Sequence, residues 1–249
     1  MKISVITATY NCGETLGTTL ESMAAQTHGD IEHIVMDGGS KDDTMDMVRA
    51  WTAHPIRWES GKDKGIYDAL NKGVACASGD IVGFLHADDV LEDREVLARI
   101  AKAFEDPSVQ AVYGDLVLAE QEDIRRVIRY WRAGEFDRGS LKRGWMPPHP
   151  TVYLRRSLFD RVGPFDLRYR IAADYDWLLR MLKLEDLRLA YLPSVLVRMR
   201  VGGISNRSLR NILLKSSEDL AISRKHDVGG LTTIALKNLS KLGQFWARP

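Results

Sequence analysis

The chain has 249 residues, with 35 Lys and Arg against 34 Asp and Glu, so its formal net charge is +1. A hydrophobic fraction of 45% with 28% charged residues is ordinary for a globular protein and excludes a disordered, collagen-like or disulfide-stapled chain. Near-neutrality also gives no reason to expect a nucleic-acid binder, which usually carries a strong basic excess. The two cysteines suit a reducing compartment, and no window is apolar over the roughly 18 residues needed to cross a bilayer. We therefore expect a cytoplasmic protein with one main domain and an appendage, either fully soluble or peripheral on the membrane face.

Short β-branched runs alternate with helical periods over the first hundred residues. The expected strands are 3–8, 31–36, 56–59 and 81–85, with helices between them, among them 43–53 and 66–77. This alternation predicts right-handed βαβ crossovers and a parallel sheet covered by helices on both faces, with ligands beyond the carboxyl ends of its strands. The polar residues that follow each strand should therefore gather at one edge: Tyr10 and Asn11, Asp37, Asp63, and Asp88 with Asp89.

The pattern changes after residue 109. Two antiparallel strands are expected at 109–118 and 125–131, then a Gly- and Pro-bearing loop at 132–150. A strand at 151–154 and helices at 156–162 and 174–184 follow. Two amphipathic helices are expected beyond residue 205, on the helical spacing of apolar residues from Leu209 to Leu220 and from Leu231 through Leu242 to Trp246. Residues 205–249 hold eight Lys and Arg against three Asp and Glu, a charge of +5, which leaves −4 for the preceding part.

The pair Asp88–Asp89 directly follows an apolar run. Two adjacent carboxylates are costly to hold together unless a cation or hydrogen-bond donors neutralise them. Mg²⁺ and Mn²⁺ prefer such oxygen ligands and share their coordination with substrate phosphates. The alternative is a solvated turn that caps the next helix, because Asp suits N-caps. The neighbouring polar residues at the other strand ends favour a nucleotide site.

The ordered motifs resemble glycosyltransferase family 2, in particular bacterial polysaccharide enzymes of the colanic-acid type. The motifs are Ile3–Thr7 with Tyr10 and Asn11; Val35–Ser40 with Asp42 and Thr44; Asp63–Ala69 with Asn71–Gly73; Gly79–Asp80; and Phe84–Asp89. The resemblance implies a GT-A fold, which is a Rossmann-like, mostly parallel sheet flanked by helices, here with a small antiparallel sheet on the acceptor side and C-terminal amphipathic helices. It also implies inverting transfer of a sugar from a nucleotide sugar to an acceptor hydroxyl, with a divalent metal.

The resemblance also assigns roles to the residues of the donor side. Thr7 and Tyr10 line the base pocket, Asp37 and Asp63 hydrogen-bond the base or ribose, Asp88 lies by the ribose and metal, and Asp89 is the direct metal ligand. The sequence departs from the common pattern at Gly38, where many relatives have a second Asp that contacts uracil. A UDP-sugar is the favoured donor, with GDP- and dTDP-sugars as alternatives.

Asp174 matches the family residue that acts as base. A sugar hydroxyl is a poor nucleophile until a base takes its proton. Asp176 is the neighbouring candidate, but on a helix it lies about 200° around from Asp174, so the two cannot face one site. The alternative role for Asp174 is the N-cap of its helix.

Weaker assignments complete the site. His149 resembles a family element that shapes the acceptor side, Arg200 could face the diphosphate, and Trp145 could stack on a sugar ring, whereas Trp177 falls on an apolar stripe typical of the core. Their alternatives are a structural loop histidine and a surface ion pair.

The sequence therefore predicts a metal-dependent inverting hexosyltransferase that acts on a glycan or lipid-linked glycan in bacterial surface polysaccharide synthesis. The alternatives are sugar transfer to polyprenyl phosphate and a catalytically idle nucleotide-sugar-binding scaffold. The expected organisation is a GT-A domain at 1–206, with a donor half at 1–106 and an acceptor half at 107–206, followed by a basic helical tail at 207–249. That tail meets a membrane surface, a second subunit or the domain itself.

Overall fold

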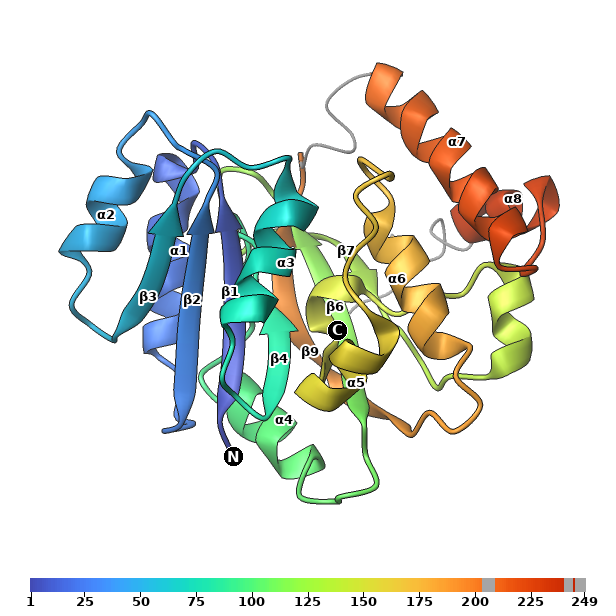
Figure 1. The fold of residues 1–249 in the computed structure, drawn as a ribbon, viewed down its shortest axis with the longest axis horizontal. Coiled ribbons are helices and arrows are strands. Elements are labelled where there is room, and N and C mark those ends of the chain that lie inside the picture. Colours follow the sequence, from blue (N-terminus) through green and yellow to red (C-terminus); the bar gives the residue numbers. More distant parts are fainter. Residues whose placement is uncertain (203–208, 240–243, 245–249) are drawn as a thin grey trace.

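One mixed sheet of nine strands runs through the part of the chain that this computed structural model describes, residues 1–202, 209–239 and 244 (Figure 1). Its order is β3-β2-β1-β4-β8-β6-β9-β5, with β7 also paired to β6. The strands are β1 (Ile3–Thr9), β2 (Ile31–Asp37), β3 (Ile56–Ser60), β4 (Ile81–Phe84), β5 (Val90–Leu91), β6 (Ala111–Ala119), β7 (Val127–Trp131), β8 (Tyr153–Arg155) and β9 (Leu189–Arg200).

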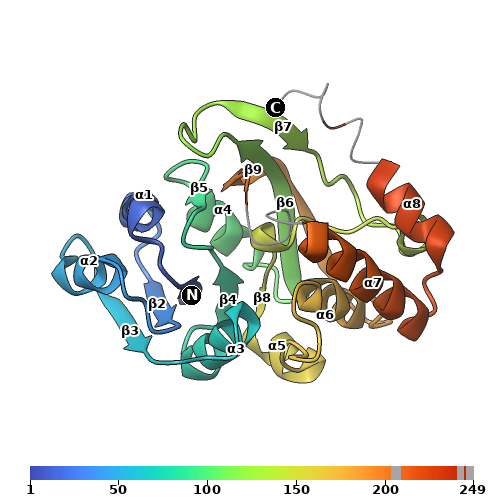
Figure 2. The same ribbon diagram turned by 90° about the horizontal axis from the view of Figure 1, so that it is seen from above.

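Helices cover both faces of this sheet (Figure 2). They are α1 (Gly13–Ala24), α2 (Thr44–Ala50), α3 (Ile66–Cys76), α4 (Val96–Ala103), α5 (Arg156–Val162), α6 (Ala173–Leu182), α7 (Leu209–Lys225) and α8 (Leu231–Leu239), with 3-10 turns at η1 (Arg138–Arg143) and η2 (His149–Thr151). Successive residues of a strand point to opposite faces. Ile6 of β1 thus packs in the cluster of α3, α5 and α6, while Val5 packs in the cluster of α4.

The predicted parallel half is confirmed. β1 pairs in parallel with β2 and β4, and β2 with β3, so the carboxyl ends of these strands share one edge. The antiparallel pair β6–β7 is also present, but it does not form a separate small sheet. β8 pairs antiparallel with both β4 and β6, which joins the two halves into one sheet and points β6 in the same direction as β4.

The long strand β9 is a feature that the sequence pattern did not predict. It runs parallel to β6 along its whole length, although it contains Pro193. Proline cannot donate to a strand ladder and is tolerated at bulges. The register shifts at this point: Gly114 pairs with Leu192 and Asp115 with Val195, so Pro193 and Ser194 fall into a bulge.

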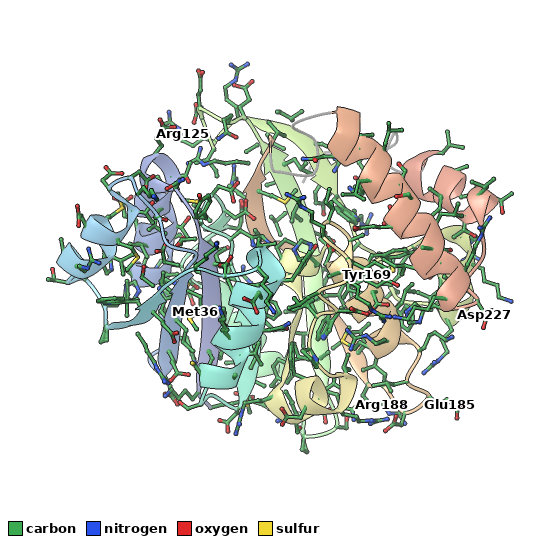
Figure 3. The ribbon with its side chains drawn as sticks, turned by 45° about the horizontal axis from the view of Figure 1, so that its top comes forward. Met36, Arg125, Tyr169, Glu185, Arg188 and Asp227 are labelled. Carbon is green, nitrogen blue, oxygen red and sulfur yellow. The ribbon has the colours of Figure 1, made fainter. Side chains whose placement is uncertain are left out.

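The C-terminal helices pack against the domain, with α7 beside α6 (Figure 1). Ile222 and Val228 are buried in the same core cluster as the apolar residues of α6. Lys225 Nζ lies 5.4 Å from the ring of Tyr169, which Figure 3 labels. Among the residues that the structure describes, no helix is long and apolar enough to cross a bilayer. The side chain of Leu209 and the whole of Leu242 and Trp246 lie outside the described residues.

Candidate functional site

The carboxylate of Asp37 accepts hydrogen bonds from five neighbouring donor groups. These donors are the hydroxyls of Thr9, Ser40 and Ser60 and the backbone N–H groups of Gly39 and Ser40. Burial raises the pKa of Asp37, but these hydrogen bonds outweigh it and lower the pKa below its ordinary value. Asp37 therefore ties the ends of β1, β2 and β3 together and holds a fixed negative charge at this edge.

Of the two residues predicted to line the base pocket, the structure places one at the edge and one behind it. Tyr10 is 61% exposed just past the end of β1. Thr7 is fully buried inside β1, and its hydroxyl bonds to Nε2 of His33 at 3.0 Å. The side chain of Thr7 thus belongs to the packing between β1 and β2.

Asp63 lies against Gly38, where the sequence departs from the family pattern. Its carboxylate accepts the Gly65 backbone N–H at 2.8 Å. A Cβ added to Gly38 would approach Asp63 Oδ2 to 2.8 Å, closer than real Cβ contacts. The missing side chain at position 38 therefore makes the space that Asp63 occupies.

The two carboxylates after β4 differ in exposure. Asp88 is partly exposed, whereas Asp89 is 1% exposed. Oδ1 of Asp89 accepts the backbone N–H of Arg200 at 3.2 Å, and Oδ2 has no hydrogen-bond partner among the residues that the structure describes. Burial, and then the charge of Asp88, raise the pKa of Asp89 well above its ordinary value. The structure thus presents Asp88 at the edge and places Asp89, predicted as the direct metal ligand, behind it.

Arg200 is also buried. It is 7% exposed, and its guanidinium donates to the Gln121 carbonyl at 2.8 Å and to the Thr18 hydroxyl at 3.2 Å. These bonds differ from the surface ion pair of the alternative, and a role of Arg200 at a diphosphate stays a prediction. The neighbouring motif residues Gly203, Ile204 and Ser205 lie outside the described residues.

Asp174 is held by side chains from two distant segments. It lies in the first turn of α6, whose N-cap is Ala172, so it does not cap the helix. His149 Nδ1 lies 3.2 Å from Oδ2 of Asp174, and the Tyr67 hydroxyl lies 3.1 Å from Oδ1. Burial, and then the charge of Asp174, raise the pKa of Tyr67 well above its ordinary value, so Tyr67 stays a protonated donor.

His86, just past the end of β4, contacts His149. Its Nε2 lies 2.8 Å from Nε2 of His149. Burial lowers the pKa of His86, while the charges of Asp88 and Asp174 both act in the opposite direction, which places both carboxylates within electrostatic reach of one ring. The His86–His149 pair thus connects Asp174, which contacts His149, with the segment after β4 that carries Asp88.

Asp176 faces away from this site, as its position on a helix predicted. It is fully buried and bound by Arg180, Lys225 and His226. Burial raises the pKa of Asp176, but the hydrogen bonds from His226 and Lys225 prevail and lower it far below its ordinary value. Asp176 therefore anchors α7 and has no access to a substrate.

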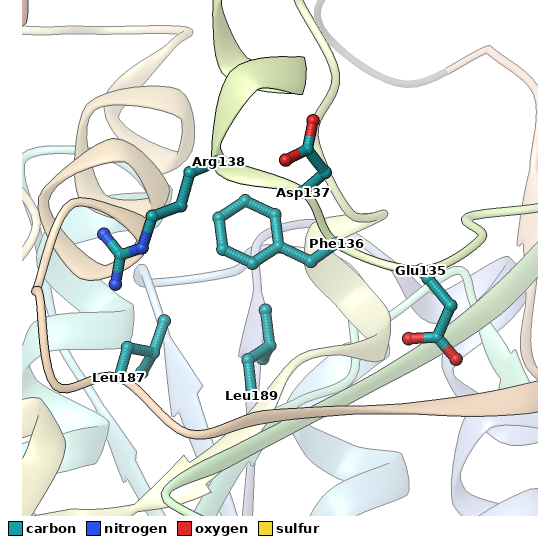
Figure 4. Close-up of a pocket in the computed structure, with 6 residues that line it drawn as sticks. All are labelled: Glu135, Phe136, Asp137, Arg138, Leu187 and Leu189. Atoms are coloured by element: carbon teal, nitrogen blue, oxygen red, sulfur yellow. The ribbon is translucent and has the colours of Figure 1, made fainter.

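The two tryptophans and a nearby pocket lie around the loop 132–150. Trp177 is 2% exposed in the core, as predicted. Trp145 donates to the Ala133 carbonyl at 2.8 Å and packs on Phe136, so its indole supports the loop. A pocket of about 340 Å³ opens beside Phe136 (Figure 4). Its other lining residues are Glu135, Asp137, Arg138, Leu187 and Leu189. Leu189 begins β9 beside the first residue of β6, at the opposite end of these strands from the carboxyl edge.

Three contributors to the site were not assigned from the sequence. Tyr67 and His86 stand inside the quoted motifs, so the motifs could have indicated them. Glu218 of α7 accepts the backbone N–H groups of residues 170–172 just before Asp174, and a glutamate in a charged helix carries no sequence signal of such a contact.

Comparison with known proteins identifies the family. The family model Glycosyl transferase family 2 matches residues 4–163. A "PGL/p-HBAD biosynthesis glycosyltransferase" of Mycobacterium tuberculosis is 35% identical over 218 residues, which are 85% of this chain and 82% of the relative. An uncharacterized glycosyltransferase of Nostoc sp. is 33% identical over 185 residues, 70% of this chain and 57% of the relative.

Solved structures share the fold. The mannosyltransferase PcManGT from Pyrobaculum calidifontis, in complex with GDP-Man and Mn²⁺, has a TM-score of 0.70 at 21% identity and covers 96% of this chain, which spans 69% of that one. S. aureus TarS 1–349 in complex with UDP-GlcNAc has a TM-score of 0.68 at 18% identity and covers 92% of this chain, which spans 66% of that one. By its family match, its relatives and its fold, this chain belongs to glycosyltransferase family 2.

Proposed function

We propose that this glycosyltransferase inverts configuration at the sugar, with Asp174 as the base that activates an acceptor hydroxyl. The observation that carries the proposal is the placement of Asp174, which Tyr67 and His149 orient and which the His86 ring connects electrostatically to Asp88. A carboxylate held by neighbours at the junction of donor and acceptor halves is suited to accept a proton during transfer.

The chemistry is a single displacement. Asp174 takes the hydroxyl proton while the acceptor oxygen bonds to the anomeric carbon and the nucleotide diphosphate leaves from the opposite face, so no covalent glycosyl-enzyme forms. A polyprenyl phosphate acceptor, already anionic, would need no such base, and an idle scaffold would need no ordered one. The ordering of Asp174 favours a hydroxyl acceptor over both alternatives.

Asp174→Asn tests this assignment. The amide has the size of the carboxylate but accepts no proton, so transfer should fall by about 10²-fold or more while nucleotide binding survives. Transfer is followed with a nucleotide-sugar donor and a glycan acceptor, and binding by calorimetry. Asp160→Asn, an exposed carboxylate on α5, is the matched control. Transfer by Asp174→Asn at the wild-type rate would refute the assignment.

The donor is proposed to be a UDP-sugar, with GDP- and dTDP-sugars as competitors in one screen. Asp63 and the exposed ring of Tyr10 are available at the edge for its base and ribose. Thr7 and Arg200 are too buried to contribute their side chains directly. Thermal-shift curves with each nucleotide decide among the three bases, and a lack of any shift would contradict a nucleotide-sugar donor.

A divalent metal fits this edge only together with the donor. Among the described residues, no group of three or more His, Cys, Asp or Glu side chains is placed to hold an ion. Asp88 is partly exposed, and Oδ2 of the buried Asp89 has no partner within the described part of the chain. Mg²⁺ is commonly bound by one or two carboxylates plus substrate phosphates. Asp88 would hold the ion, which would neutralise charge on the leaving diphosphate. Mn²⁺ should therefore bind tightly with UDP present and weakly alone.

The acceptor is proposed to be a glycan or lipid-linked glycan at an anionic lipid surface, with residues 1–106 serving the donor and 107–206 the acceptor. Leu213 and Leu231 of the basic C-terminal region are 71% and 70% exposed, and Lys and Arg near exposed apolar residues suit anionic headgroups. Sedimentation with phosphatidylglycerol vesicles should be lost in Leu213→Glu/Leu231→Glu and kept in Leu167→Glu, a control on the body. Loss of a dimer by the double variant, without any vesicle binding by the wild type, would instead assign this face to a second subunit.

A further inference from the structure

Helix α7 reaches the segment that carries Asp174 through one carboxylate. Glu218 is 9% exposed. Its Oε1 accepts the backbone N–H of Arg170, and its Oε2 accepts those of Ile171 and Ala172, all at 2.9 Å. Hydrogen bonds of backbone N–H groups to an ionised carboxylate are about twice as strong as neutral ones. Three consecutive amides are thus fixed by one side chain from a helix more than forty residues further along the chain.

These amides stand where α6 lacks a cap of its own. The N-cap residue Ala172 has no side chain that could accept a hydrogen bond. The first N–H groups of a helix need partners, and a negative charge near this end is favoured by the helix dipole. Glu218 accepts the N–H of the N-cap residue Ala172 and those of the two residues before it, and it brings a negative charge to this end of the helix, so α7 holds the entry into α6.

Tyr67 fixes the same segment from the other side. Its hydroxyl donates to the Ile171 carbonyl at 2.7 Å and also lies 3.1 Å from Asp174 Oδ1. The peptide at Ile171 is therefore held at its N–H by Glu218 and at its carbonyl by Tyr67. A displacement of this peptide would move the first turn of α6, and Asp174 with it, relative to Tyr67 and His149.

We propose that Glu218 is a positioning residue for the transfer reaction, which holds residues 170–172 so that Asp174 meets the acceptor hydroxyl. The proposal rests on the role of Asp174 proposed above. Glu218 touches no substrate in this role. Through Glu218, α7 helps to position Asp174, whereas the contact of α7 with Asp176 serves only to dock the helix.

That second anchor provides the matched control. Lys225 Nζ lies 2.7 Å from Asp176 Oδ1 at the other end of α7, far along the helix from Glu218. Asp176 keeps Arg180 and His226 in Lys225→Met. This variant weakens the docking of α7 without removing a bond to residues 170–172, so the two variants separate docking from positioning.

The experiment compares Glu218→Ala, Glu218→Gln, Lys225→Met and Asp174→Asn. Misplacement of a reacting group by about 1 Å can cost about 10²-fold in rate, so Glu218→Ala should lower kcat about 10- to 100-fold with the donor KM and the calorimetric affinity for UDP unchanged. Glu218→Gln keeps one accepting oxygen, so its kcat should fall less than that of Glu218→Ala. Lys225→Met should stay within about twofold of wild type. Hydrogen exchange should quicken at the amides of residues 170–172 in Glu218→Ala and not in Lys225→Met.

Each other outcome overturns the proposal. A wild-type kcat in Glu218→Ala with quickened exchange would show that the segment need not be held, and an equal loss in Lys225→Met would show that Glu218 only docks α7. If Glu218→Ala fails to fold, Glu218→Gln decides: a wild-type kcat would overturn the proposal. Asp174→Asn distinguishes failure of the proposed base from failure of the positioning role. If Asp174→Asn transfers sugar normally, the assignment of the base is wrong. If Asp174→Asn is inactive while both Glu218 variants keep the wild-type kcat, only the role of Glu218 is wrong.

Discussion

His149 stands between two partners that fix the position of its proton. The carboxylate of Asp174 can only accept, so Nδ1 of His149 must carry the hydrogen, and neutral His149 then accepts from His86 at Nε2. Burial lowers the pKa of His149 to about 4, against the opposing charge of Asp174. His149 therefore orients the base as a neutral donor and places no full positive charge beside it.

His149→Phe should remove both of these hydrogen bonds while filling similar space. We expect kcat to fall about 10- to 100-fold, because Asp174 loses one of its two orienting partners, with donor affinity unchanged. His28→Phe is the control, because the His28 ring is partly exposed and contacts the Met1 carbonyl, not the site. The wild-type rate should also show no acid limb near pH 6.5, since His149 stays neutral down to about pH 5. A limb at that pH would contradict the neutral imidazole.

Gly38 is the residue at which this chain departs from the common family pattern. An aspartate there would bring a second carboxylate against Asp63. Gly38→Asp should therefore weaken UDP binding about tenfold in calorimetry, by displacing Asp63 and adding like charge. Gly61→Asp introduces the same charge where nothing lies within 4 Å of the new Cβ, and should bind UDP normally. Equal binding by both variants would show that Asp63 does not serve the donor.

Between elements, a directed chain of hydrogen bonds joins the end of α2 to β2 and β1. Trp51 Nε1 donates to His54 Nδ1, so His54 donates from Nε2 to Nδ1 of His33, and His33 donates from Nε2 to the Thr7 hydroxyl. Each ring must be neutral for the chain to hold. Burial, and then the charge of His54, lower the pKa of His33 to about 3.

This series of hydrogen bonds predicts a loss of stability in mild acid. His33 binds a proton near pH 6.5 in the unfolded state and only near pH 3 in the folded state. Between these values the unfolded state binds more protons, so the free energy of unfolding decreases as the pH is lowered. Tm should drop from pH 7 to pH 4.5. His33→Asn should be less stable at pH 8 but lose less on acidification, the residual slope coming from the other buried histidines. The same slope in both proteins would contradict the role of His33.

The sequence patterns predicted the elements in which apolar residues recur at a regular spacing. They failed where contacts between distant segments determine the structure. The four parallel strands and their polar ends follow from local periodicity. β9 was missed because Pro193 interrupts it, and only pairing with β6 absorbs the bulge. Asp174 was assigned from the family motif, whereas its partners Tyr67 and His149 meet it only through the fold. Asp89 and Thr7 were assigned from motif position, which does not determine whether a side chain faces the edge or the packing.

Across the whole molecule, the near-neutral charge separates into a body of −4 and a C-terminal part of +5, and part of that positive charge is used internally. Lys225 and His226 meet Asp176, which is fully buried. A buried charge that loses its partners costs about 3–5 kcal/mol. The C-terminal helices are therefore needed by the fold.

Deletion of residues 209–249 should yield an aggregating or strongly destabilised protein, because Asp176 and the amides of residues 170–172 lose their partners. Deletion of 240–249 removes none of these contacts and is the control. The Tm of each deletion variant is compared with that of the full chain by thermal unfolding. A long deletion that stays soluble with an unchanged Tm would show that α7 and α8 contribute nothing to the body.

The contacts of α7 also order events during synthesis. The strands of the sheet leave the ribosome before the C-terminal helices, whereas a domain generally folds as a unit. Glu218 emerges after every strand of the sheet. Until α7 has emerged, the buried Asp176 and the amides of residues 170–172 lack these partners, so the body cannot reach its final stability before nearly the whole chain has been made.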